Sequence, residues 1–93
     1  EAIVNFGKAV DFERRFDEAW FNRALIYSKM KDWRNALPDL NQAIFYKNNN
    51  ASYFYMRAVV KKELNNTSAC ADLRKAVQLG MKLVEKEQIR ICE

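Results

Sequence analysis

The chain has 93 residues, which is enough for one domain, and its content of 49% hydrophobic and 30% charged residues is typical of a folded protein. No apolar run approaches the roughly 18 residues of a membrane span. The 16 Lys and Arg exceed the 12 Asp and Glu by four, but basic and acidic residues alternate along the chain. This mixture is typical of a solvated surface and does not favour nucleic-acid binding.

The first predicted helix covers residues 2–12. Apolar residues recur on one side of it at helical spacing: Ala2, Phe6, Ala9 and Val10. This helix corresponds to the second half of a helical pair whose first half lies outside the sequence, so we expect the chain to be a segment of a longer protein. Its uncovered side, with Ile3, Phe6 and Val10, is a hypothetical surface for stacking on a preceding repeat or for self-association with another copy.

The next stretch, residues 17–50, reads as one complete helix-turn-helix unit. We predict helices at 18–30 and 33–46, with Asp17 as the N-cap of the first helix. Six small, aromatic or branched residues lie three, four or seven apart and form the apolar stripes: Trp20, Ala24, Tyr27, Ala36, Leu40 and Ala43. Pro38 lies inside the second helix, where we expect it to face solvent and to kink the helix locally.

A second unit follows at residues 51–80. We predict helices at 52–64 and 69–79, after which Gly80 ends the second helix in a left-handed conformation. Lys61 stands where the first unit has an aromatic residue, so we expect poorer packing at that point. Beyond this unit, charged residues alternate with Met81, Val84, Ile89 and Cys92, which predicts a terminal capping helix with one apolar face. A partner-binding or membrane-surface helix is the alternative.

The chain also aligns with itself at steps of 34 and 33 residues. The aligned sets are Ala2, Ala36 and Ala69; Phe6, Leu40 and Leu73; Ala9, Ala43 and Ala76; and Arg23 with Arg57. A period near 34 with this residue pattern resembles the tetratricopeptide repeat. The resemblance implies an all-α fold, in which antiparallel helix-turn-helix repeats stack as a short right-handed superhelix. It divides one domain, residues 1–93, into a truncated repeat at 1–16, repeats at 17–50 and 51–80, and a capping helix at 81–93.

The segment from Ala69 to Gly80, together with Cys92, is also similar to the closing repeat of bacterial tetratricopeptide proteins, particularly those of Bacteroidetes. Cys70 occupies a slot that is apolar in the other repeats, where a buried thiol is common. We expect two free thiols, because nothing in the chain fixes its compartment. The alternative is a disulfide with Cys92, which would close a loop of about 22 residues and add about 3 kcal/mol of stability.

The sequence lacks the residue patterns of an enzyme. It has no histidine, no GxxxxGK[ST] phosphate loop and no GxGxxG turn, so no catalytic group, cofactor or metal site is predicted. Two distant cysteines are too few ligands for zinc. We therefore expect a non-enzymatic protein.

The resemblance instead implies binding of a peptide or protein segment in a concave groove lined by the first helix of each repeat. If the apolar stripes face partner helices, the groove residues are Phe21, Asn22, Leu25, Lys29, Tyr55, Met56, Val59 and Lys62. The alternative for Phe21 and Tyr55 is ordinary packing on neighbouring helices. Some relatives of this family clamp the acidic tail of heat-shock chaperones, but Ser52 and Met56 replace the required Lys and Arg, which disfavours that partner here.

Overall fold

The computed structural model describes residues 16–82 and 85–92, without the side chains of residues 85–87 and 89. The helix predicted at residues 2–12, with its hypothetical stacking surface, lies outside the described residues, as does Val84. The chain divides into two compact units, residues 1–48 and 49–93. All described elements are α-helices, which confirms the predicted all-α class.

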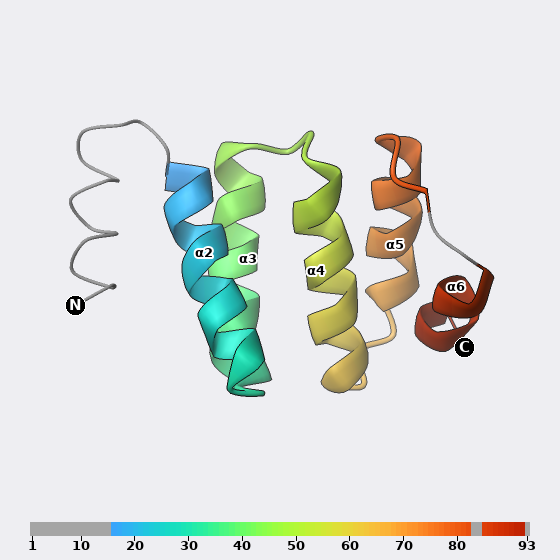
Figure 1. The fold of residues 1–93 in the computed structure, drawn as a ribbon, viewed down its shortest axis with the longest axis horizontal. Coiled ribbons are helices and arrows are strands. Elements are labelled where there is room, and N and C mark those ends of the chain that lie inside the picture. The colour runs from blue at the N-terminus through green and yellow to red at the C-terminus, as the bar shows by residue number, and fades with distance from the viewer. Residues whose placement is uncertain (1–15, 83–84, 93) are drawn as a thin grey trace. The chain divides into compact units, whose positions relative to one another are not determined.

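The first unit contains the hairpin of α2 (Phe16–Lys29) and α3 (Trp33–Tyr46), which lie side by side (Figure 1). The bounds of α3 agree with the prediction. Helix α2 begins two residues before the predicted start, so the prediction of Asp17 as N-cap was wrong. Asp17 lies within the first turn instead, where its negative charge still favours the positive end of the helix.

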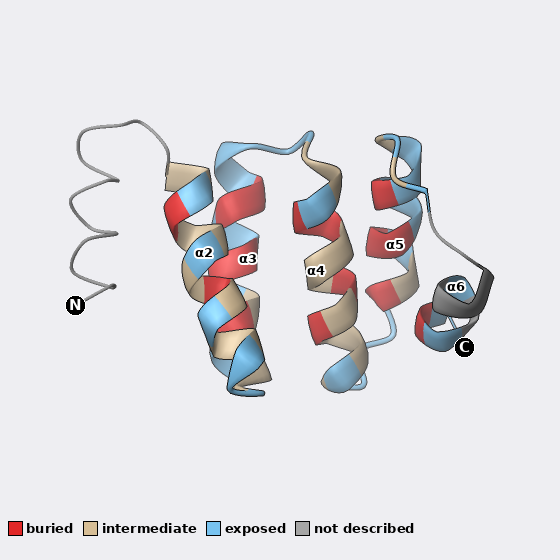
Figure 2. Ribbon diagram, in the orientation of Figure 1, coloured by how far each residue is buried: buried red, intermediate tan, exposed pale blue. Residues whose placement is uncertain are grey.

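The core of this unit consists of alanines with one leucine and one isoleucine, Ile44. Ala24 on α2 and Ala36, Leu40 and Ala43 on α3 are completely inaccessible to solvent. Figure 2 shows the buried parts of both helices in red. Alanines at a helix crossing let the two backbones approach closely, and Leu40 fills the remaining space. Pro38 is exposed, as its outward position predicted, and α3 continues through it.

The second unit contains α4 (Ala51–Glu63), α5 (Ala69–Gln78) and α6 (Glu85–Cys92). Asn50 caps α4, because its side-chain oxygen accepts hydrogen bonds from the backbone N–H groups of Ser52 and Tyr53 at 2.9 and 3.3 Å. Helix α6 packs on α5 and contacts α4. It begins at Glu85, later than predicted, and among its described side chains Ile91 is buried, at 3% exposure, which the predicted apolar face omitted.

Three of the helices end in the same left-handed turn. Lys31 after α2 and Asn65 after α4 both have φ of 59°, and Gly80 after α5 has φ of 108°, which confirms the prediction for Gly80. In each case the next N–H reaches back five residues, as in the bond of 2.8 Å from Asp32 to the carbonyl of Tyr27. This Schellman motif satisfies carbonyls that the helix end leaves unpaired and reverses the chain locally.

Candidate functional site

The predicted groove residues of the first unit form one stripe along α2. Phe21 and Leu25 are half-buried, whereas Asn22 and Lys29 are exposed. At about 100° per residue, the four side chains fall within an arc of about 100°. We call this set the α2 stripe; it combines two apolar side chains with an amide and an ammonium group.

An ion pair fixes which side of α2 faces α3. Arg23 donates two hydrogen bonds of 2.8 Å, from Nε and Nη2, to the carboxylate of Asp39 on α3. The guanidinium also lies 5.1 Å from the ring centroid of Trp20 and 5.8 Å from that of Tyr27. Since Arg23 lies about 150° around the helix from the middle of the α2 stripe, the stripe faces away from this contact.

Arg23 stays protonated, and therefore positively charged, across the physiological pH range. Its hydrogen bonds to Asp39 raise the pKa of Arg23 above the usual arginine value, and this effect outweighs the opposing effect of burial. A raised pKa means that the stabilising contribution from the charge of Arg23 is fully present below the unfolded pKa and is lost as the pH rises through the folded pKa. Both pKa values lie far above the physiological range, so Arg23 remains charged throughout it.

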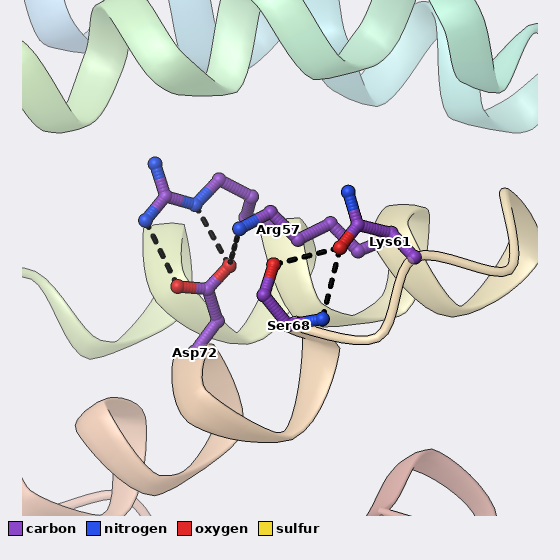
Figure 3. Close-up of polar contacts among 5 residues, drawn as sticks. Arg57, Lys61, Ser68 and Asp72 are labelled. Atoms are coloured by element: carbon purple, nitrogen blue, oxygen red, sulfur yellow. Dashed lines mark hydrogen bonds and ion pairs between the residues drawn. The ribbon is translucent and has the colours of Figure 1, made fainter.

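The second unit repeats this arrangement on α4, with an added cation. Arg57 donates from Nε and Nη2 to Asp72 on α5 at 2.8 Å, and Lys61 Nζ lies 2.9 Å from the same carboxylate (Figure 3). Lys61 stands where the first unit has an aromatic residue, and it forms an ion pair there. The expectation of poorer packing at this position did not include that ion pair. Asp39 and Asp72 are the buried carboxylates of the two pairs, with side chains 3% and 7% exposed.

The equivalent groove residues on α4 are all half-buried and form the α4 stripe: Tyr55, Met56, Val59 and Lys62. They fall within an arc of about 120° that faces away from Arg57. Tyr55 and Val59 pack against a buried cluster formed by Ala58, Ala69, Leu73 and Ile91. Because Ile91 belongs to α6, this helix lies against part of the α4 stripe.

The expectation of two free thiols was wrong, because Cys70 and Cys92 form a disulfide. The bond joins the first turn of α5 to the last residue of α6. A pocket of about 330 Å³ opens beside it, lined by both cysteines, Ile91, Lys62 and the turn at residues 65–67. The thiol that the sequence placed in an apolar slot therefore has a covalent structural role.

Within residues 16–82 and 85–92, no group of three or more His, Cys, Asp or Glu is placed to hold a metal ion. None of the helices in this part of the chain is long and apolar enough to cross a membrane. Among the described residues, the polar groups of the candidate site belong to the α2 and α4 stripes and to the two arginine-aspartate pairs.

Sequence reasoning missed both aspartates, although a signal was present. Arg23 and Arg57 were aligned at a step of 34, and Asp39 and Asp72 lie 33 apart, the same step that separates Ala36 from Ala69. A carboxylate that recurs beside a buried alanine stripe requires a partner, because burial of an unpaired charge is costly. The recurring arginine supplies that partner.

Helix pairs with alanine crossings, repeated Schellman turns and a repeated arginine-aspartate pair define a helical-repeat protein. In sequence, the chain is similar to sperm-associated antigen 1 of Homo sapiens, with 28% identity over 86 residues, which is 91% of this chain and 9% of that protein. It is also similar to the E3 ubiquitin-protein ligase CHIP of Arabidopsis thaliana, with 32% identity over 82 residues, 85% of this chain and 29% of that protein.

Both relatives contain tetratricopeptide repeats, and the chain spans less than a third of the length of either. No family model matches the chain, and no solved structure matches it. Neither relative is bacterial, so the resemblance to bacterial proteins stays a prediction. The similarities support a protein-interaction module in general terms.

Proposed function

We propose that the chain is a non-enzymatic module in which each unit binds a peptide or protein segment, the first unit through the α2 stripe and the second through the α4 stripe. The observation that carries this proposal is the orientation of α2. The pair between Arg23 and Asp39 fixes one side of the helix against α3, and the opposite side presents Asn22 and Lys29 to solvent beside half-buried Phe21 and Leu25.

This combination suits an extended peptide. An asparagine side chain both donates and accepts hydrogen bonds, so Asn22 can pair with a peptide backbone. Phe21 and Leu25 offer an apolar floor for one side chain, and the ammonium group of Lys29 favours a carboxylate, as that of Lys62 does in the second unit. We therefore propose a partner segment that carries an apolar residue next to acidic ones.

A peptide-display library selected on the immobilised full chain tests the proposal. The selected sequences should combine an apolar residue with Asp or Glu, and fluorescence anisotropy then gives the Kd of a labelled synthetic peptide. The double variant Asn22→Ala/Lys29→Glu changes two exposed residues of the α2 stripe, so we expect at least a tenfold higher Kd, which corresponds to about 1.4 kcal/mol.

The matched control is Gln42→Ala/Lys47→Glu, which makes the same change in charge and a similar change in side-chain size at exposed positions on or next to α3. We expect its Kd to stay within twofold of the parent value. Circular dichroism should show equal helix content in all three chains. Equal weakening by the two double variants, or a selection that returns no binder, would contradict binding through the α2 stripe.

A further inference from the structure

Helix α6 is too short to hold its position by its own helical stability. It has eight residues, whereas isolated helices below about 12–15 residues are marginal in water. Among its described side chains, Ile91 is buried, while Gln88, Arg90 and Cys92 are exposed. The position of α6 therefore depends on the packing of Ile91 and on the disulfide from Cys92 to Cys70.

The disulfide is placed where a thiol reductant can reach it. Cys92 is exposed, Cys70 is half-buried, and both line the pocket of about 330 Å³. Cys70 lies in the first turn of α5, whose positive end stabilises a thiolate, and the cationic residue Lys62 lines the same pocket. Cys70 is thus the better leaving group when a thiolate attacks the sulfur of Cys92.

We propose that this disulfide is a site of thiol-disulfide exchange that controls whether α6 covers the α4 stripe. The inference rests on the proposed function, because the α4 stripe is one of the two proposed contact surfaces. In the oxidised chain, Ile91 packs in the cluster against which Tyr55 and Val59 lie. After reduction, α6 departs and that apolar surface becomes accessible to a partner.

The exchange requires a dithiol reductant. Its thiolate attacks Sγ of Cys92, the bond between the two cysteine sulfurs breaks, and the electron pair passes to Sγ of Cys70, which takes a proton from water. The second thiol of the reductant, as a thiolate, then attacks the reductant sulfur of the mixed disulfide and releases Cys92, which is protonated in turn. Two electrons enter the protein, and the reductant leaves as a cyclic disulfide.

The chemistry of α6 indicates the partner class that would replace it. The face that Ile91 occupies accepts a branched apolar side chain from a short helix whose other described side chains are exposed. We therefore infer that the uncovered surface takes an amphipathic helical segment with one aliphatic anchor.

Hydrogen exchange of the full chain, read by mass spectrometry with and without dithiothreitol, tests the switch without any partner. We expect the amides of α6 to exchange at least tenfold faster after reduction, whereas those of α2 and α3 change by less than twofold. The Cys70→Ser/Cys92→Ser variant should match the reduced chain in both conditions. Unchanged exchange in α6, or equal acceleration throughout α4 and α5, would overturn the proposal.

Binding of anilinonaphthalene sulfonate, a dye that fluoresces on apolar surface, checks the uncovering directly. Fluorescence should rise on reduction and be equally high in the double serine variant without reductant; no rise in either would contradict the proposal.

The rate of reduction tests the role of Lys62. Lys62→Gln should slow reduction several-fold relative to Lys75→Gln, which changes an exposed lysine on α5, and equal rates would contradict the assignment of Cys70 as the leaving group assisted by Lys62. Because these measurements use no peptide, their failure is distinguishable from failure of the peptide selection.

Discussion

Replacement of Asp72 by asparagine should destabilise the second unit more than the equivalent change at Asp39 destabilises the first. Asp72 accepts two hydrogen bonds from Arg57 and forms an ion pair with Lys61, so the change leaves two cations facing a neutral amide. Among the described residues, Asp39 pairs with Arg23, whose guanidinium keeps its contacts with two aromatic rings, whereas that of Arg57 lies over Phe54. Asparagine preserves the shape of the side chain, so the difference isolates the charge.

The exposed fractions set the size of the two effects. Removing one partner of a fully buried ion pair costs about 3–5 kcal/mol. The side chains of Arg57 and Lys61 are 19% and 14% exposed and retain some hydration, so we expect the low end of that range, about 3 kcal/mol. Arg23 is 28% exposed, and the loss of its charged hydrogen bonds should cost about 2 kcal/mol.

Urea denaturation can separate the two units. Trp20 and Trp33 both lie in the first unit, so tryptophan fluorescence reports on α2 and α3, whereas circular dichroism at the helical band reports on all helices. Glu63→Gln, an exposed charge change on α4, is the control and should alter the unfolding free energy by less than about 0.5 kcal/mol. A cost for Asp72→Asn no larger than that for Asp39→Asn would refute the reasoning.

Four further changes can be measured in the same urea series. Asn50→Ala removes the cap of α4 and should cost about 1 kcal/mol, and no loss would exclude a role for its two hydrogen bonds. Lys31→Gly should stabilise by about 0.5–1 kcal/mol, because lysine holds a left-handed φ of 59° there; a loss would contradict this. Gly80→Ala should cost about 1 kcal/mol through backbone strain alone, since an added Cβ meets nothing within 4 Å. Leu40→Ala should cost about 2–5 kcal/mol through its cavity, and a smaller cost would mean that the core collapses around it.

Helical periodicity predicted the elements well, and the differences have tertiary causes. The bounds of α3 follow from local sequence, since its apolar stripe and its flanking turns coincide with its ends. Helix α2 starts before Asp17 because the ring of Phe16 stacks on that of Tyr46, with centroids 4.8 Å apart. A contact between residues 30 positions apart thus outweighed the local capping signal, which periodicity alone cannot show.

The candidate site was less accessible to sequence reasoning. Helical spacing grouped the four members of each stripe on one face of a helix, and their role as a groove stays a prediction; the spacing did not show that α6 would lie against Tyr55 and Val59. The state of the cysteines depends on where α6 docks, and that docking depends on Ile91, whose burial among charged neighbours has no clear periodic signal. The docking of α6, which is a long-range contact, therefore determined both the disulfide and the packing against the α4 stripe, and the local sequence pattern did not show it.

The short span of the ion pairs has a consequence for the order of folding. Arg23 pairs with a residue 16 positions away and Arg57 with one 15 positions away, so each hairpin closes over a short loop. Chains with such local contacts fold rapidly, because little entropy is lost before the first long-range contact forms. During synthesis, the contacts between α2 and α3 can therefore form as soon as Tyr46 has left the ribosome, before the cysteine at position 70 has emerged from it.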